Sequence, residues 1–181
     1  MKKNIFTYAL MTAFCLCFSG KLQAQFYSAG TNIPVLGTAT LNAELSMTLD
    51  RWHSIHLPVY YNPFVFSGNK KIQNFTLLPG VRRWALESYI GGFIGVNAIG
   101  SKYHFTWKNN RYKGQAYGMG ISAGYALMLS PRWNLEAELG IGLVWADYEK
   151  YPCEKCTRKI EDESGWHAVP NKVGISLVYL F

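Results

Sequence analysis

Residues 115–147, QAYGMGISAGYALMLSPRWNLEAELGIGLVWAD, decide the fold of this chain. On both sides of Ser130–Arg132, large apolar residues alternate with residues that are small or charged. Successive side chains of a strand point to opposite faces, whereas a helix would place Glu136 and Leu139 on one face. The stretch therefore predicts two long β-strands that fold back on each other, each with one apolar face.

The pairing of the two strands follows from their apolar faces. If Ser130–Arg132 is the loop, Leu129 faces Trp133 and the apolar faces coincide along the whole ladder. A two-residue loop would set Leu129 opposite Arg132 and turn one strand inside out. We therefore predict a three-residue loop.

The length and the aromatic residues of this hairpin indicate a membrane. Each strand has about 13 residues, which at roughly 3.3 Å per residue and a tilt near 40° spans about 33 Å. That exceeds the roughly 30 Å hydrocarbon core of a bilayer, and strands of soluble proteins usually have only about 5–6 residues. Aromatic residues end the apolar face at both sides, as membrane interfaces require. The predicted interface aromatics are Trp52, Trp84, Trp133, Tyr117, Trp145 and Phe181.

Similar alternation occurs along the rest of the chain. It predicts eight strands, at 27–36, 41–49, 53–61, 74–83, 89–100, 114–129, 133–147 and 169–181. An Arg-Trp pair lies at each of three short connections, where amphipathic Trp and a nearby Arg suit a membrane interface. The predicted fold is all-β: an eight-stranded antiparallel transmembrane β-barrel with short periplasmic turns and longer extracellular loops.

The two ends of the chain indicate its destination. Residues 1–24 have Lys2 and Lys3, an apolar run and a small-residue end, the pattern of a cleaved signal peptide. Residues 25–181 are then one outer-membrane β-barrel domain, located in the outer membrane of a Gram-negative cell. The last strand ends on Phe181, with Tyr179 two residues before, which looks like the signal that the barrel-insertion machinery recognises.

The excess of positive charge is concentrated in the predicted long loops. Without Lys2, Lys3 and Lys21 the formal net charge falls from +7 to +4. The predicted long loops, 62–73, 101–113 and 149–168, contain ten Lys and Arg against five acids. These residues form either a solvated loop set or a basic collar near lipid phosphates.

Several charged residues fall on the inward face of the predicted strands. Glu44, Glu136 and Glu138 point inward, and Arg82 or Lys172 is available to pair with them. We expect structural packing of the interior. Paired carboxylates for acid–base chemistry would need a substrate path through a narrow interior that side chains largely fill.

The cysteines and histidines do not indicate an enzyme. Cys153 and Cys156 form a Cys-x-x-Cys, for which the oxidising periplasm favours a disulfide. Zinc would need more ligands than His167, the nearest candidate, and redox catalysis would need a βαβ setting. The four histidines, His53, His56, His104 and His167, are spread along the chain, and no Ser/His/acid grouping is evident. The sequence thus predicts no catalytic residue, cofactor or metal.

The longest predicted loop, 149–168, is the predicted contact site for a partner protein. It contains the acidic run Glu161, Asp162 and Glu163 and the aromatic Trp166. Exposed loops on a rigid scaffold often carry function, and an aromatic beside mixed charges suits a protein interface. The alternative is an ordinary mobile loop tied by one disulfide.

The chain resembles an uncharacterised family of small outer-membrane β-barrels from Bacteroidetes, a domain of unknown function. The matching stretches are Tyr61-Asn62-Pro63-Phe64, the Arg-Trp turn with Asn134–Glu138, Tyr148–Cys156 and Gly174–Tyr179. The resemblance implies genes near fimbrial genes, and hence work at the cell surface. It implies no catalytic residues.

These observations predict a non-enzymatic outer-membrane β-barrel that presents extracellular loops, as an anchor or accessory for surface structures such as fimbriae. The alternative is a lipid-modifying enzyme, an acyltransferase or deacylase. A solute channel is disfavoured because eight strands enclose little space. The expected partners are outer-membrane lipid including lipopolysaccharide, the insertion machinery, and a surface or fimbrial protein, with no nucleic acid.

Overall fold

The computed structural model describes residues 26–66, 70–107, 110–151 and 161–181. The predicted signal peptide and the predicted Cys153–Cys156 disulfide lie outside these residues. The described residues form an antiparallel sheet, which confirms the all-β, antiparallel prediction. The elements are β1 (Tyr27–Asn32), α2 (Ile33–Gly37), β2 (Leu41–Thr48), β3 (His53–Asn62), β4 (Val65–Phe66), β5 (Lys70–Leu77), β6 (Gly80–Trp84), β7 (Gly91–Trp107), β8 (Asn110–Ser130), β9 (Trp133–Tyr151) and β10 (Glu161–Leu180).

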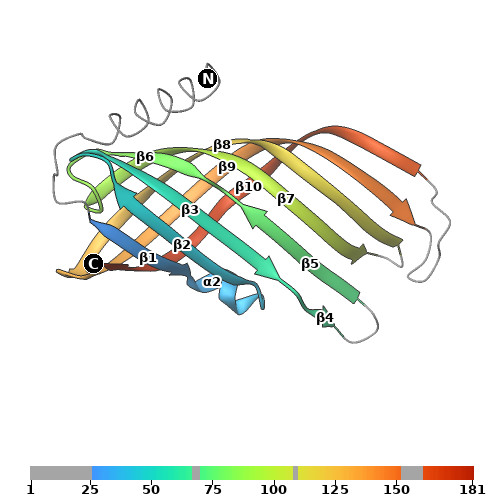
Figure 1. Ribbon diagram of the computed structural model, residues 1–181, viewed down its shortest axis with the longest axis horizontal. Coiled ribbons are helices and arrows are strands. Elements are labelled where there is room, and N and C mark those ends of the chain that lie inside the picture. Colours follow the sequence, from blue (N-terminus) through green and yellow to red (C-terminus); the bar gives the residue numbers. More distant parts are fainter. Residues whose placement is uncertain (1–25, 67–69, 108–109, 152–160) are drawn as a thin grey trace, which may run out of the picture.

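The sheet closes on itself. β1 lies between β10 and β2, and the order of neighbours continues from β2 through β3, β7, β8 and β9 back to β10. β5 and β6 share one place between β3 and β7, because each pairs with both of these strands. The described strands therefore form a closed ring with eight strand positions (Figure 1). No helix among the described residues is both long and apolar enough to cross a membrane.

The hairpin of β8 and β9 has the predicted register over most of its length. Ile121 pairs with Ile141 as predicted, but Ser130, rather than Leu129, pairs with Trp133. A register shift just before Ser130 absorbs one residue, and a two-residue turn follows. The predicted three-residue loop is therefore wrong. The register shift is confined to the pair beside the turn, Ser130 and Trp133. A bulge there allows the short turn while the apolar residues of both strands stay on the outer face.

The long strands run well beyond the predicted boundaries. Segments 62–73, 101–113 and 149–168 are largely strand over their described residues, so their assignment to loops is wrong. The apolar alternation stops where the apolar band stops, whereas backbone pairing continues through polar residues. The residues of the predicted partner loop, Glu161, Asp162, Glu163 and Trp166, belong to β10 and pair with Lys150, Glu149, Tyr148 and Trp145.

The first predicted strand, 27–36, ends early. β1 stops at Asn32, whose side chain accepts a hydrogen bond from the backbone N–H of Val35 at 3.3 Å and so caps α2. Pro34 favours this change because its ring fixes φ and suits the first turn of a helix. The backbone N–H of Asn32 also donates to Oδ1 of Asn42 at 2.6 Å. The chain therefore leaves the sheet at Asn32 and returns as β2.

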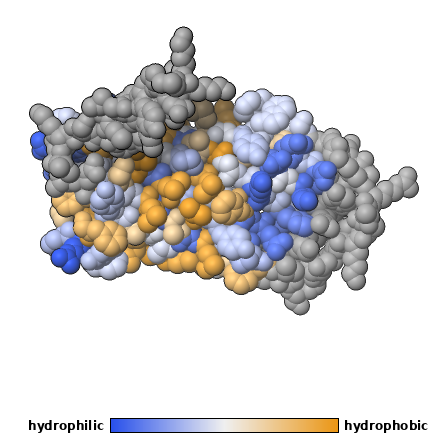
Figure 2. Space-filling model, in the orientation of Figure 1, coloured by the Kyte–Doolittle hydropathy of each residue, from blue (hydrophilic) through white to orange (hydrophobic). Residues whose placement is uncertain are grey.

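Large apolar side chains cover the outer face of the ring. Figure 2 shows them as an orange band on one side of the molecule, between hydrophilic residues toward its two ends. Of the predicted interface aromatics, Trp52, Trp133, Tyr117, Trp145 and Phe181 are exposed. Trp84 is buried, so an interfacial position for it is wrong: it lies two residues after the inward Arg82 and must share its face.

Candidate functional site

Aromatic side chains fill the interior at the end of the ring that has the short turns. Trp84, Tyr89, Phe93 and Ala126 are buried there in one cluster. The ring of Trp84 lies 4.7 Å from that of Phe93 and 5.5 Å from that of Tyr89, between centroids. This aromatic layer closes the interior on that side.

Tyr89 reaches this layer from the connection between β6 and β7. Its hydroxyl lies 2.8 Å from Oγ of Ser46, and its carbonyl accepts a hydrogen bond from Nδ2 of Asn134 at 2.6 Å. The backbone of Tyr89 has a φ of +68°, a left-handed conformation that is unfavourable for a residue with a Cβ. These contacts from β2 and β9 therefore hold a strained residue inside the ring.

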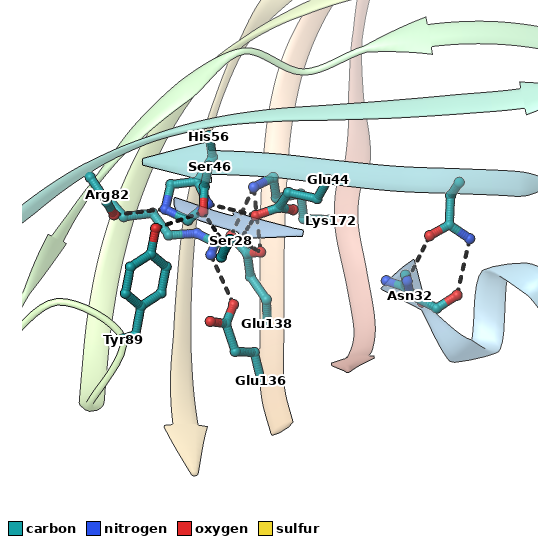
Figure 3. Close-up of polar contacts among 12 residues, drawn as sticks. Ser28, Asn32, Glu44, Ser46, His56, Arg82, Tyr89, Glu136, Glu138 and Lys172 are labelled. Carbon is teal, nitrogen blue, oxygen red and sulfur yellow. Dashed lines mark hydrogen bonds and ion pairs between the residues drawn. The ribbon is translucent and has the colours of Figure 1, made fainter. Parts of the chain in front are cut away.

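Five charged side chains form the next layer, which we call the ionic cluster: Glu44, Arg82, Glu136, Glu138 and Lys172 (Figure 3). Arg82 Nη1 donates to Oε2 of Glu136 at 2.9 Å, and its Nη2 donates to Oε2 of Glu138 at 2.6 Å. The same Nη2 lies 2.9 Å from Oε1 of Glu44, and Lys172 Nζ lies 3.2 Å from Oε1 of Glu138. One guanidinium thus binds three carboxylates.

The cluster joins strands that are distant in the sequence. Its members come from β2, β6, β9 and β10, and they are the same five residues that sequence analysis places in the interior. Alternation along each strand predicts that these side chains face the interior. It does not predict that Arg82 contacts all three carboxylates, because that depends on the stagger of strands around the ring.

The charges of the cluster are nearly balanced. Three carboxyl groups face two basic groups, Arg82 and Lys172, so one further proton would balance the formal charges. Nδ1 of His56 lies 2.6 Å from Oε1 of Glu44, and Oε1 of Glu136 has no hydrogen-bond partner among the described residues. Each of these sites could hold that proton, since a buried charge is costly unless paired.

Sequence analysis missed a second grouping, Ser54, His56 and Glu44. Oγ of Ser54 lies 2.7 Å from Nε2 of His56, whose Nδ1 contacts Glu44. Ser54 and His56 are two residues apart on β3, and Glu44 is on the adjacent β2. A Ser-x-His on one predicted strand, beside an inward Glu on the strand before, is the signal that would have found it.

Serine, histidine and glutamate are linked in the order of a hydrolytic triad, but Ser54 and His56 are buried inside the ring. Nε1 of Trp84 donates to Oγ of Ser54 at 2.7 Å, and Ser54 has a relative exposure of 0%. A nucleophile must reach a bound substrate. In this conformation the serine joins the aromatic layer to the ionic cluster instead.

The turn after β2 shows how one Arg-Trp pair is fixed. Oδ1 of Asp50 accepts hydrogen bonds from the backbone N–H groups of Trp52, at 2.7 Å, and His53, at 2.9 Å. The bond from Trp52, followed by that from the His53 side chain, lowers the pKa of Asp50. The turn is therefore held by an anionic Asp50, with Arg51 and Trp52 exposed beside it.

The other predicted site residues lie elsewhere. Trp166 is exposed on β10, edge-to-face with Trp145 at 5.5 Å between ring centroids. The backbone of 161–163 is strand, at the end of the ring away from the short turns. Among the residues that the structure describes, no group of three or more His, Cys, Asp or Glu side chains is arranged to hold a metal ion.

The architecture is that of a closed antiparallel ring of strands with a charged interior. Comparison with known protein families gives one match. The family described as "Protein of unknown function (DUF3575)" matches residues 9–181. The chain belongs to this family. No curated protein and no solved structure matches the chain. The predicted phylum and the predicted fimbrial gene neighbourhood stay predictions.

Replacing Arg82 tests the role of the ionic cluster. Arg82→Met leaves three carboxylates without their shared partner, and we expect a loss of roughly 3–5 kcal/mol in the free energy of unfolding. Urea unfolding of the refolded protein in detergent micelles, followed by tryptophan fluorescence, measures it. Arg83→Met is the matched control, because Arg83 is exposed on the outer face of the same strand. Equal stability of the two variants would contradict a structural role for the cluster.

Proposed function

We propose that this chain is an eight-stranded transmembrane β-barrel of the Gram-negative outer membrane, with no enzymatic activity, that anchors or assists structures at the cell surface. The observation that carries the proposal is an apolar outer face around a charged interior, the reverse of a water-soluble protein. Isolated exposed apolar residues are ordinary, but a contiguous apolar surface marks contact with lipid or protein.

The register makes this apolar surface continuous. One row across β7, β8, β9 and β10 consists of Ile94, Ala123, Leu139 and Val173, and the next consists of Val96, Ile121, Ile141 and Pro170. The residues of both rows are exposed. Along these rows β7, β8 and β9 are paired with a strand on each side, which is the condition for strands inside a bilayer.

The ends of the chain support the same placement. Residues 1–24 have the pattern of a signal peptide, and the chain ends on an exposed Phe181. The backbone N–H of Phe181 donates to the carbonyl of Tyr27 at 2.9 Å, so the last strand closes the ring against the first. A C-terminal strand of this form suits recognition by the barrel-insertion machinery.

The two ends of the barrel differ, and this supports an orientation. Short turns with Arg-Trp pairs at 51–52 and 132–133 lie at one end, and β7 to β10 extend at the other (Figure 1). Short turns are periplasmic in known outer-membrane barrels. The extended end, with Trp166 and the acidic run 161–163, is then the surface for a fimbrial or other surface protein, beside lipopolysaccharide.

The interior does not favour a channel. The aromatic layer and the ionic cluster fill the periplasmic half of the barrel with buried side chains. Small eight-stranded barrels characteristically fill in this way. Because these two layers obstruct the interior, the barrel is better suited to anchoring than to transport of solutes.

A charge on the lipid face tests membrane insertion. Leu139→Arg places a cation at the middle of the apolar band, where we expect a cost of about 2–4 kcal/mol and poor folding into vesicles. Heat-dependent migration on detergent gels measures the folded fraction. Leu129→Arg is the control: Leu129 is equally outward but adjoins the turn, where the cost falls to about 0–1 kcal/mol. Equal folding of both variants would argue against a membrane-spanning band.

The orientation is tested by labelling whole cells. Trp166→Cys and Leu49→Cys, each in a Cys153→Ser/Cys156→Ser background, place one thiol at each end of the barrel. We expect a membrane-impermeant maleimide to label Trp166→Cys in intact cells and Leu49→Cys only after lysis, since both positions are exposed. The reverse pattern would invert the proposed orientation.

The alternative function, a lipid-modifying acyltransferase or deacylase, has one observation in its favour, the Ser54–His56–Glu44 grouping. Because Ser54 is buried, we expect Ser54→Ala to leave the lipid A profile of a complemented deletion strain unchanged, as measured by mass spectrometry. The variant should instead lose about 1–3 kcal/mol of stability, since Trp84 and His56 lose a buried partner. A lipid A modification that the wild type restores and Ser54→Ala does not would establish the enzyme.

A further inference from the structure

The wall of the ring is incomplete beside β10. β1 pairs with β10 only over five positions, from Ser28↔Leu180 to Asn32↔Ser176. β10 continues to Glu161, bonded to β9 on its other side. On the side of β1, the described residues give β10 no strand partner beyond Ser176, and the short helix α2 lies there instead. Figure 1 shows β1 ending in α2 while β10 runs on.

The local sequence maintains this gap. Nδ2 of Asn32 donates to the carbonyl of Val173 at 3.4 Å, which fixes the point where β1 departs. A Cβ on Gly174 would clash with the side-chain amide of Asn32, so glycine at this position leaves room for Asn32. Next along β10, Pro170 lacks an N–H group, and the register shifts between Pro170 and Lys172. Proline and bulges are typical of strand edges that have no further partner.

The gap faces the apolar part of the membrane proposed above. Trp166 and Trp145 contact each other on the outer face and mark the outer end of the apolar band. The unpaired edge of β10, from Val173 towards Trp166, lies between that aromatic pair and the exposed Ile175. Bare strand edges are costly in hydrocarbon and are tolerated where they line a cavity or are covered.

A cavity of about 650 Å³ lies behind the gap. Val35 of α2 and Val173 of β10 line it from the two sides of the gap, and Leu78, Ile99 and Val144 line its far wall. No Asp, Glu, Lys or Arg contributes to its lining. Its volume falls within the usual range for small-molecule sites. Its walls combine apolar side chains with uncharged polar groups, among them Tyr60, Asn74 and Tyr103, and with His167.

The floor and the mouth of the cavity differ in polarity. Asn171, the residue at the register shift, forms part of the lining, and its Nδ2 donates to Oδ1 of Asn97 at 3.0 Å. A second cavity, of about 750 Å³, adjoins towards the extracellular end and shares Asn74 and Tyr103 with the first. Its charged residues include Lys102 and Asp147, which are exposed and share the outward face of Tyr117 and Trp145. The first cavity thus has no Asp, Glu, Lys or Arg in its lining, whereas the second has several. This change suits an amphiphilic ligand.

We infer that this cavity binds one acyl chain of a membrane lipid, which enters sideways from the outer leaflet through the gap between α2 and β10. The inference rests on the proposed membrane placement, because the gap opens onto the lipid face. Apolar side chains such as Leu78, Ile99 and Val144 give a hydrocarbon chain that enters through the wall a surface on which it avoids bulk water. The charged mouth is then available to the polar headgroup.

Photo-crosslinking maps the occupant. The full chain is folded into vesicles of phosphatidylethanolamine that contain a phospholipid with a diazirine in one acyl chain, and the labelled residues are located by mass spectrometry. We expect label on the interior residues Ile99 and Val144 as well as on the outward Ile141. Label on Ile141 without label on Ile99 and Val144 would overturn the inference while leaving the membrane placement intact. No label on Ile141 would overturn both.

A parallel experiment with a free diazirine fatty acid separates two sources of the chain. Interior label from the phospholipid supports lateral entry, because the headgroup holds that lipid in the bilayer. Interior label from the free acid alone would overturn lateral entry and point to the charged mouth.

A pair of variants on β8 tests whether the label depends on the cavity. Ala116 is buried and lines the cavity, whereas Ala123 is exposed on the outer face of the same strand. We expect Ala116→Phe to abolish label on Ile99 and Val144, and Ala123→Phe to preserve it. Unchanged interior label in folded Ala116→Phe would overturn the inference. If that variant does not fold, the wild-type map above remains decisive.

Discussion

Arg82 is the residue on which the interior of this protein depends. A buried guanidinium is tolerated when opposite charges pair with it, and here Glu44, Glu136 and Glu138 converge on its two Nη atoms from β2 and β9. Lys172 adds β10 through Glu138. A single contact set thus ties together strands on different sides of the ring. Backbone hydrogen bonds join each strand only to its immediate neighbours, so side-chain contacts across the ring such as this cluster favour one stagger over others.

The ionic cluster divides the interior into two halves with different properties. Towards the short turns, Trp84, Tyr89 and Phe93 pack into one buried cluster, and a cavity of about 510 Å³ lies among the turns, lined in part by Tyr89. Towards the other end, the interior contains a cavity of about 650 Å³ lined by apolar side chains and by uncharged polar ones such as Tyr60 and Tyr148. Glycines on β8 and β9 follow from crowding: the side chain of Asn171 occupies the space where Gly120 and Gly140 would carry a Cβ. Buried layers in one half and a cavity in the other suit a scaffold that holds a molecule better than one that conducts solutes.

The gap beside β10 and the ring closure have a common origin at Asn32. Asn32 caps α2, bonds to Asn42 and contacts the β10 backbone, so it ends β1 after six residues. A longer β1 would seal the wall. The opening leaves one edge of β10 unpaired. Pro170 and the register shift at Asn171 make this edge less able to pair with another strand.

Periodicity in the sequence was sufficient for the strand class, the inward and outward faces of β8 and β9, and the register between Ile121 and Ile141, because these depend on local alternation alone. It did not give the strand ends, since pairing of backbone groups continues where apolar residues stop. It placed Trp84 at an interface although Arg82, two residues earlier, had to point inward. Only the tertiary structure decided that Ser54, His56 and Glu44 meet, that Arg82 serves three carboxylates, and that the wall opens beside β10. Those features depend on how strands are staggered around a closed ring, and alternation along one strand contains no information about the stagger of its neighbours.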